Sequence, residues 1–223
     1  MLRVLASLAA AVALASPVAA DDCPDKTAAR AGFVLERAGT TSEVRPVSDL
    51  FTHVRNTYPS GKTQDVLYFR GLFDVSRRDE SAHRLSVPLT DLRTLFPLDV
   101  GARRAVTFVL AEPGKAGPPL SLELTVAGRE TFRMGACRYD VLVVRNRTLN
   151  AAGKVTSQYT DLYAPDLGIV LGRRFDDGGG RQTSVLFESI RLLPRPSPRR
   201  RPPVRGSRSV RSASRSRSRR SEP

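Results

Sequence analysis

The fold of this chain is decided by residues 130–145, which read ETFRMGACRYDVLVVR. Within this stretch, residues 141–144 are apolar at every position, a pattern typical of a β-strand that is covered on both faces. Residues 150–153 (NAAG) then predict a turn, and residues 156–163 predict the strand that returns beside it. We therefore expect a β-hairpin at the centre of the protein.

The stretch just before this one carries the most regular alternation in the chain. Four apolar residues at every second position are separated by Ser121, Glu123 and Thr125; they are Leu120, Leu122, Leu124 and Val126. Successive side chains of a strand point to opposite faces, so the segment predicts a strand with one face on a core and the other in water. We expect the four apolar residues to face the interior.

Short apolar segments separated by turn-forming residues continue along the chain in both directions. They are residues 32–37, 40–45, 50–58, 65–75, 105–110, 169–175 and 183–192. Helical signal is confined to residues 89–98, where Thr90 is a candidate N-cap, and residues 114–119 predict a loop. No helix-length crossover separates the strands, so parallel pairing is disfavoured. The pattern predicts an all-β fold, a mainly antiparallel half-barrel or barrel with at most one short helix.

The central stretch also resembles a family of periplasmic domains. The similar segments are residues 130–132, 135–141 and 163–168, together with residues 95–101 further upstream. They resemble motifs of uncharacterised Gram-negative periplasmic β-domains, including domain of unknown function 3108, and the likeness spans roughly residues 90–192. That family is similar in turn to the lipoprotein-carrier superfamily. The resemblance implies a curved open sheet that can hold an acyl chain, and it implies no catalytic residues.

The N-terminus has the pattern of a secretory signal peptide over residues 1–20. Arg3 supplies a positive start, residues 4–15 are apolar, and residues 18–20 (VAA) provide small side chains at the cleavage site. The apolar run is too short to span a membrane as a helix. We expect a mature chain without a transmembrane segment, located in the periplasm or secreted, with one β-rich domain over residues 21–193.

The chain has two cysteines, Cys23 and Cys137. A single pair has only one connectivity, and the oxidising compartments outside the cytoplasm favour a disulfide over two free thiols. We predict a disulfide that attaches the mature N-terminus to the central strand. Closing so long a loop stabilises a fold by about 4–5 kcal/mol in the chain-entropy model.

Residues 194–223 form a tail rich in arginine, serine and proline. It carries eleven arginines and one acidic residue in a chain of formal net charge +14, so most of the excess positive charge lies outside the domain. This composition buries too little apolar area to offset chain entropy, and we expect the tail to be disordered. In a cell envelope its arginines would contact anionic lipid or wall polymers, and an extension that has no partner is the equal alternative. The candidate contacts are Arg199, Arg200, Arg201, Arg215, Arg217, Arg219 and Arg220.

No motif in the sequence predicts catalysis, a metal or a cofactor. Residues 56–63 (NTYPSGKT) end like a phosphate-binding loop, but Asn56 replaces the first glycine of that motif and a strand follows instead of a helix. His53 and His83 lack further ligands at the spacing that zinc requires. Residues 70–75 do not fit the RNA-recognition pattern.

We therefore expect a non-enzymatic exported domain that binds a lipid or another apolar ligand in a curved sheet, with Leu120, Leu122, Leu124 and Val126 facing that ligand. The alternative is a structural envelope protein that acts through its arginine-rich tail. A hydrolase assembled from distant serine, histidine and aspartate residues is the least favoured hypothesis. We predict no specific nucleic-acid partner and no cofactor, and the oligomeric state stays open.

Overall fold

The computed structural model describes residues 23–176 and 182–193. The signal peptide predicted over residues 1–20 and the tail predicted over residues 194–223 lie outside the described residues, so both stay predictions. The same applies to the predicted anionic-surface contacts, which are Arg199, Arg200, Arg201, Arg215, Arg217, Arg219 and Arg220.

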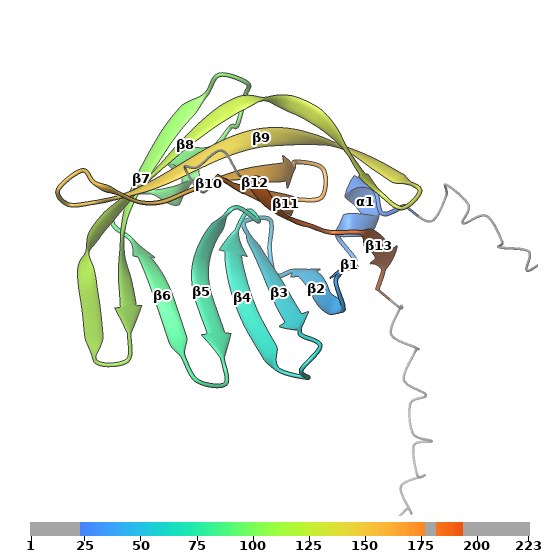
Figure 1. The fold of residues 1–223 in the computed structure, drawn as a ribbon, viewed down its shortest axis with the longest axis horizontal. Coiled ribbons are helices and arrows are strands. Elements are labelled where there is room, and N and C mark those ends of the chain that lie inside the picture. Colours follow the sequence, from blue (N-terminus) through green and yellow to red (C-terminus); the bar gives the residue numbers. More distant parts are fainter. Residues whose placement is uncertain (1–22, 177–181, 194–223) are drawn as a thin grey trace, which may run out of the picture. The chain divides into compact units, whose positions relative to one another are not determined.

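Almost all of the described chain belongs to one antiparallel β-sheet (Figure 1). Its thirteen strands are β1 (Phe33–Arg37), β2 (Thr40–Pro46), β3 (Phe51–Thr57), β4 (Thr63–Phe69), β5 (Phe73–Asp79), β6 (His83–Pro88), β7 (Arg103–Glu112), β8 (Lys115–Met134), β9 (Cys137–Asn150), β10 (Val155–Ala164), β11 (Ile169–Asp176), β12 (Gln182–Leu186) and β13 (Ser189–Leu192). From β1 to β12 each strand pairs with the next strand in the chain, and β13 pairs with β1. Short turns can join only antiparallel neighbours, and the predicted antiparallel all-β fold is confirmed.

Two residues of the chain join the two ends of this sheet. Strands β12 and β13 stand at opposite ends of the strand order, yet only Phe187 and Glu188 separate them. The Phe187 amide donates to the carbonyl oxygen of Leu171 on β11 at 3.1 Å, and the Glu188 amide donates to that of Glu36 on β1 at 2.9 Å. No ladder of hydrogen bonds joins the ends of the described sheet. It is therefore a strongly curved open sheet, which corresponds to the half-barrel of the two predicted forms.

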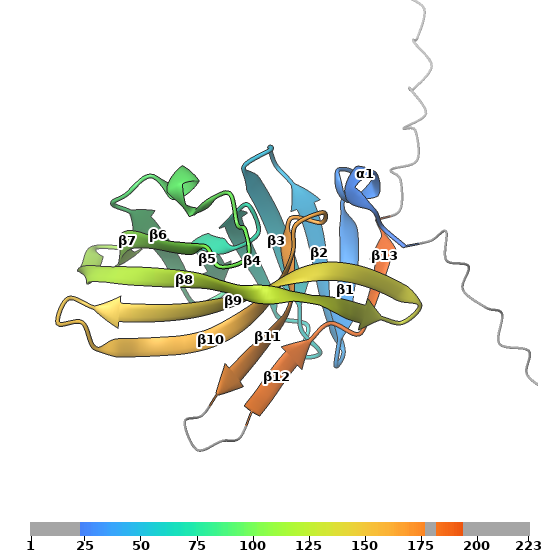
Figure 2. The ribbon, with the colours of Figure 1, turned by 90° about the horizontal axis from the view of Figure 1, so that it is seen from above.

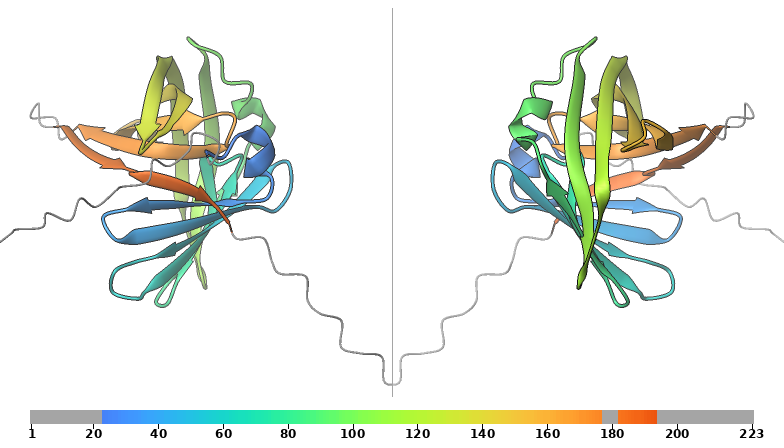
Figure 3. Two further views of the ribbon diagram at one scale, coloured as in Figure 1. Left: turned by 90° about the vertical axis from the view of Figure 1, so that its right-hand side faces the viewer. Right: turned by 90° about the vertical axis from the view of Figure 1, so that its left-hand side faces the viewer.

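The curvature brings the halves of the sheet over one another. Figure 2 shows β12 continuing into β13, which lies beside β1. In Figure 3 the layer formed by β1–β5 lies beneath β9–β11. Residues from both layers meet in the core, since Leu35 of β1 shares a buried cluster with Leu171 of β11.

The long β8–β9 ribbon divides the core into two clusters. A register shift after Val126 adds an extra residue to β8, and such a bulge changes which face the following side chains present. Leu124 and Val126, before the bulge, lie in one cluster, whereas Phe132 and Met134, after it, lie in the other. Strand β9 contributes Val141 to the cluster of Phe132 and Met134, which we call the first core cluster. It contributes Leu142 and Val144 to the cluster of Leu124 and Val126, which we call the second core cluster. The prediction that residues 141–144 are covered on both faces is confirmed.

Two strands predicted as single elements are each divided in the structure. Residues 65–75 form β4 and β5, because Arg70 and Gly71 have positive φ angles of 45° and 67° and reverse the chain. An arginine rarely adopts this conformation, so residue 70 gives no turn signal. Residues 183–192 are divided at Phe187, where the chain leaves one end of the sheet for the other.

The loop predicted over residues 114–119 is also wrong, since β8 begins at Lys115. Strand β9 pairs with β8 only from Leu120 onward. Pro118 and Pro119 therefore lie on a segment that pairs with β7 alone. Proline has no backbone N–H to donate, and on an unpaired edge this breaks no hydrogen bond of the sheet.

Two short helical elements accompany the sheet. The α-helix α1 (Lys26–Ala29) is capped by the side chain of Asp25. The 3-10 turn η2 (Leu92–Leu95) occupies the segment where helical signal is expected, but its N-cap is Asp91 rather than Thr90. The Thr90 hydroxyl instead accepts a hydrogen bond from a backbone amide of β7. Neither element in the described chain has the length and apolar character needed to cross a membrane.

Candidate functional site

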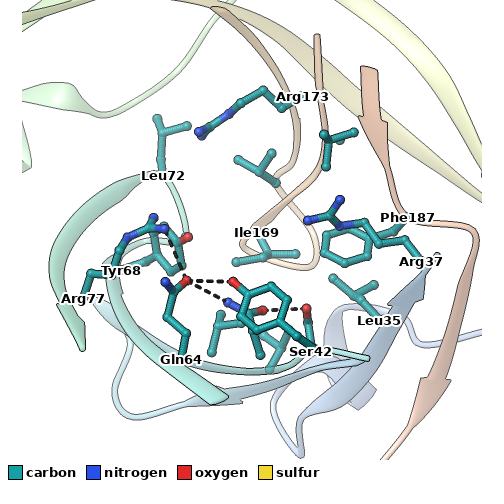
Figure 4. Close-up of a pocket in the computed structure, with 18 of the residues that line it drawn as sticks. Leu35, Arg37, Ser42, Gln64, Tyr68, Leu72, Arg77, Ile169, Arg173 and Phe187 are labelled. Atoms are coloured by element: carbon teal, nitrogen blue, oxygen red, sulfur yellow. Dashed lines mark hydrogen bonds between the residues drawn. The ribbon is translucent and has the colours of Figure 1, made fainter. Parts of the chain in front are cut away.

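A cavity of about 280 Å³ lies inside the curve of the sheet, between β1–β5 on one side and β11–β12 on the other (Figure 4). This volume is near the lower limit of ordinary small-molecule pockets. Its lining is apolar in one part and polar in the other. The lining residues are Leu35, Arg37, Ser42, Val44, Val54, Asn56, Tyr58, Gln64, Tyr68, Gly71, Leu72, Arg77, Ile169, Val170, Gly172, Arg173, Phe175, Val185 and Phe187.

The apolar part is formed by buried residues of the first core cluster, which is the cluster that contains the disulfide. Leu35 and Val44, from β1 and β2, are each 1% exposed to solvent. Val54 of β3 and Ile169 of β11 belong to the same cluster, and Phe187 packs against it. Because these residues come from both ends of the strand order, the cavity exists only when the sheet is curved.

The turn between β4 and β5 closes against the turn between β10 and β11. A Cβ atom built on Gly71 would overlap the carbonyl group of Gly168, so the two backbones are in direct contact. Only glycine fits at position 71, which also has a positive φ. The Tyr163 hydroxyl donates to the carbonyl oxygen of Arg70 at 3.0 Å. These contacts fix the separation of the two groups of strands that form the cavity walls.

A row of polar side chains crosses β2–β5 along one wall. Ser42 donates to Asn56 at 2.7 Å, and the Asn56 amide donates to the side-chain oxygen of Gln64 at 3.4 Å. The same oxygen accepts from the Tyr58 hydroxyl at 3.2 Å and from the Arg77 guanidinium at 3.3 Å, as Figure 4 shows. Hydrogen bonds that share one acceptor restrain all of their donors. The network therefore holds Arg77 in place at the cavity.

On the opposite wall, a buried carboxylate holds Arg173. The guanidinium donates to the two oxygens of Asp161 at 2.7 and 3.2 Å, and Asn146 donates to the same carboxylate at 3.0 Å. Burial raises the pKa of Asp161 above its ordinary value, and Arg173 and Asn146 oppose that rise. The Tyr159 ring centre lies 3.9 Å from the guanidinium carbon, a cation–π contact. Arg173 is therefore fixed by several independent contacts.

Tyr68 of β4 also lines the cavity, on the wall that carries Arg77. Burial raises the pKa of its phenol to about 12, and the charges of both Arg77 and Arg173 act on it. The hydroxyl is therefore protonated at neutral pH. It makes no hydrogen bond to another residue in the described chain, although it lines the cavity. It is available to donate a hydrogen bond to a ligand.

A third guanidinium, that of Arg37, lies 5.7 Å from the centre of the Phe187 ring. Arg77 pairs with Asp74 at 2.8 Å, and Arg173 pairs with Asp161 at 2.7 Å. Arg37, in contrast, has no acidic partner among residues 23–176 and 182–193. Figure 4 shows the three arginines entering the cavity from different sides. The unbalanced positive charge of the cavity comes from Arg37.

The four residues predicted to face a ligand lie in a different part of the core. Leu122, Leu124 and Val126 are buried in the second core cluster, the one that contains η2, and Leu120 packs against that cluster. Their side chains point inward, but none of the four lines the cavity. Ligand contact by these residues stays a prediction, and the cavity described above provides a separate candidate site.

Cys23 and Cys137 form the predicted disulfide, with their Cα atoms 5.6 Å apart. The bond attaches the segment before α1 to the first residue of β9. Cys137 belongs to the first core cluster, and Cys23 packs against it. The predicted connection between the N-terminal segment and the central strand is confirmed.

Tyr68, Arg77 and Arg173 belong to no recognisable sequence motif. Arg173 lies in the strand predicted over residues 169–175, where Arg173 and Arg174 interrupt an apolar run and, as neighbours on a strand, must point to opposite faces. Such an interruption is a usable signal for a polar interior position. The sequence does not show that β5 and β11 face each other across the curve, so it does not bring the three residues together.

Both histidines lie outside the cavity lining. His53 is 2.8 Å from Asp65, and His83 contacts the Ser76 hydroxyl at 3.2 Å. Within the part of the chain that the structure describes, no group of three histidine, cysteine or acidic side chains could hold a metal ion.

Among solved structures, the chain is similar to one described as the hypothetical lipoprotein YmcC from Escherichia coli K12. The TM-score is 0.44 and the sequence identity is 15%, over 77% of this chain and 89% of that chain. No family model matches, so the resemblance to domain of unknown function 3108 is not confirmed. No curated protein matches the sequence either.

Proposed function

We propose that this domain is a non-enzymatic binding protein that takes a small amphipathic anion in the cavity between β1–β5 and β11–β12. The ligand would have an apolar portion, such as one acyl chain, and a carboxylate or phosphate head. The observation that carries the proposal is the placement of Arg37, Arg77 and Arg173 around an apolar surface, with the unpaired hydroxyl of Tyr68 on the same wall as Arg77. The proposal keeps the lipid-like ligand expected from the sequence and assigns it a different site.

The head of the ligand is assigned to the guanidinium groups. A guanidinium has five N–H donors in a planar fork that matches carboxylate and phosphate. Arg173 uses two of them on Asp161, which leaves further donors for a ligand. Arg37 supplies a positive charge that no described acid neutralises. A hydrogen bond from Tyr68 would add a third kind of contact, and charged acceptors strengthen such bonds.

The apolar portion of the ligand is assigned to the surface formed by Leu35, Val44, Val54 and Ile169. Burial of a methylene group contributes about 0.8 kcal/mol. A cavity of about 280 Å³ accommodates one short chain rather than the two chains of a phospholipid. Affinity should therefore rise with chain length until the cavity is full and then stop rising.

The lining groups suit binding more than bond making. They are cations, amides, hydroxyls and apolar side chains, and neither histidine is among them. The arginines on the two walls are held by Asp74 and Asp161, which favours a fixed binding surface. The proposal therefore includes no chemical step.

The test is isothermal titration of the full chain with straight-chain carboxylates of increasing length. We expect affinity to increase about fourfold per added methylene over the first few lengths, the factor that corresponds to its burial. Arg37→Ser should weaken binding about five- to tenfold, a loss expected for one charged contact. Val185→Trp, which places an indole in the cavity from the half-exposed strand β12, should abolish it.

The matched control is Arg138→Ser, which removes an exposed arginine that does not line the cavity. It should bind like the unaltered chain, and all variants keep the arginine-rich tail. Native mass spectrometry of the protein purified from its own source should show an extra mass that organic solvent removes. Binding that is independent of chain length and unchanged by Val185→Trp would refute the proposal.

A further inference from the structure

A line of arginine and hydroxyl side chains crosses the outer face of the sheet. Strand pairing places each member directly opposite the next, over six consecutive strands from β7 to β12. In strand order the members are Arg103, Thr125, Arg145, Thr160, Arg174 and Ser184. We refer to these six residues as the arginine row.

The row lies on the side of the sheet that faces away from the second core cluster. On β8 and β9 the chain neighbours Leu124 and Val144 point into that cluster, so Thr125 and Arg145 point outward, because successive side chains alternate. Arg103 and Arg145 are exposed. Neighbouring strands are about 4.8 Å apart, so arginines recur about every 10 Å along a row of about 24 Å.

Two shallow hollows follow the row. One is lined by Arg103, Thr125 and Arg145, and the other by Arg145, Thr160 and Arg174. Both also include Arg147, so the two hollows meet on β9. We refer to these two adjoining hollows, which follow one another across the strands, as the groove.

Arginines outnumber acidic residues in the groove, where Glu123 lines the first hollow and Asp176 lines the second. Neither Arg103 nor Arg145 has an acidic partner within residues 23–176 and 182–193, whereas Arg174 pairs with Glu130 at 2.5 Å. Beside the row, Arg147 pairs with Glu123 at 3.6 Å. The unpaired charge of the row therefore lies at Arg103 and Arg145, because Glu130 offsets the charge of Arg174. Strand register places these arginines on a line across the strands.

We propose that the arginine row is a binding groove for a linear acidic polysaccharide, which lies across β7–β12. A narrow line of charge complements a single extended polyanion better than the two-dimensional surface of an anionic membrane. The hydroxyls of Thr125 and Thr160, between the arginines, suit hydrogen bonding to sugar and carboxylate oxygens. The proposal is independent of the cavity, which opens inside the curve of the sheet.

Two observations favour a polysaccharide over a single-stranded nucleic acid. Proteins that bind single strands present aromatic rings on which bases stack, and none of the six row residues is aromatic. The Tyr159 ring, which borders the second hollow, is already stacked on Arg173. In addition, the Cys23–Cys137 disulfide is typical of oxidising compartments outside the cytoplasm, where acidic polysaccharides are common polyanions.

The test compares two double variants of the full chain that lose the same charge. Arg103→Ser/Arg145→Ser removes the unpaired arginines of the row, and Arg133→Ser/Arg138→Ser removes two exposed arginines that face each other at the far end of the β8–β9 ribbon. Binding to polygalacturonate is measured at several salt concentrations. The row variant should lose about five- to thirtyfold in affinity, the range expected for two charged contacts. The control variant should lose less than twofold.

Both variants retain residues 194–223, so any binding by the tail is common to them and cancels in the comparison. As a second measurement, the Nε–H NMR resonances of Arg103 and Arg145 should shift on addition of polygalacturonate and stay unchanged with neutral dextran. Equal affinities of the two variants would overturn the proposal. It would also be overturned if the row variant lost binding to single-stranded DNA or to phosphatidylglycerol vesicles but kept its affinity for polygalacturonate.

Discussion

Gly71 and Gly168 bring two distant parts of the sheet into backbone contact, with no room for a side chain at Gly71. Gly71 lies in the turn between β4 and β5, and Gly168 directly precedes β11. The contact lies beside the cavity, which Gly71 and Ile169 both line. The contribution of this contact to stability can be separated from the strain of a positive φ angle. Other glycines of the described chain, such as Gly153, have a positive φ angle but make no such contact.

Gly71→Ala should lower the free energy of unfolding by about 3–5 kcal/mol, which combines the left-handed strain of about 1–2 kcal/mol with the cost of separating packed backbone. The control is Gly153→Ala, at a φ of 74° with no atom within 4 Å of the added Cβ. Gly153→Ala should lower the free energy of unfolding only by the left-handed strain, about 1–2 kcal/mol. Urea denaturation of both variants measures the difference, and equal losses would mean that the Gly71–Gly168 contact restrains nothing.

Arg173→Met should destabilise the protein by about 3–5 kcal/mol at neutral pH, because it leaves the buried carboxylate of Asp161 without its counter-charge. The pKa of Asp161 is raised in the folded state above its ordinary 3.8, and loss of Arg173 raises it further. The folded variant then holds a proton that the unfolded chain has released. Its stability therefore falls as pH rises from 3.8 through the raised folded pKa.

The measurement is the stability difference between Arg173→Met and the unaltered chain across this acidic range. The difference should shrink as the pH is lowered. Comparing Arg173→Met/Asp161→Asn with Asp161→Asn alone removes the titrating group from both proteins, and the pH dependence of their stability difference should vanish. A difference that stays constant with pH in the single variant would contradict the assignment to Asp161.

Stability should also decline in alkali. Burial raises the pKa values of Tyr68, Tyr139 and Tyr163 from 10.0 to about 12 in the folded protein. The unfolded chain ionises first, so stability is lost as pH rises from 10 towards 12, by up to about 1.4 kcal/mol per pH unit for each group. Tyr68→Phe removes one group without breaking a hydrogen bond of the described chain, and should make the decline less steep. An unchanged slope would show that Tyr68 ionises equally in both states.

Replacing both cysteines, as Cys23→Ser/Cys137→Ser, should lower the free energy of unfolding by about 4–5 kcal/mol, because the bond closes a loop with a sequence separation of 114. Reduction of the unaltered chain should have a similar effect, which distinguishes loss of the bond from a local effect of serine. Denaturation with and without reductant measures both. If reduction leaves the midpoint unchanged, the bond does not constrain the unfolded chain.

Much of the architecture follows from local patterns in the sequence. The alternation at residues 120–126 and the apolar run at 141–144 identify strands, because a period of two is a property of each strand by itself. Short turns between strands require antiparallel neighbours. Two cysteines in a chain with an export pattern allow one pairing, and the structure contains it. Turns built on unusual residues, such as Arg70 with positive φ, escape such patterns.

The cavity depends on contacts that no local pattern encodes. Arg77 and Arg173 lie on strands that are far apart in the strand order, and they face one cavity because the sheet curves until Phe187 and Glu188 can bridge its ends. The bulge after Val126 decides which side chains of β8 enter each core cluster. This explains why an inward-facing apolar strand could be predicted, whereas the residues that line the cavity could not.

The sequence alone was enough to predict most of the strands, their antiparallel pairing and the disulfide, since each depends on residues that are neighbours in the chain or on a pairing with one solution. Only the tertiary structure decided the cavity and the arginine row. Arg103, Arg145 and Arg174 have no regular spacing in the sequence, and they form a line because strand register places them opposite their neighbours. Register and curvature are set by the packing of all thirteen strands together, and that packing is a property of the whole sheet.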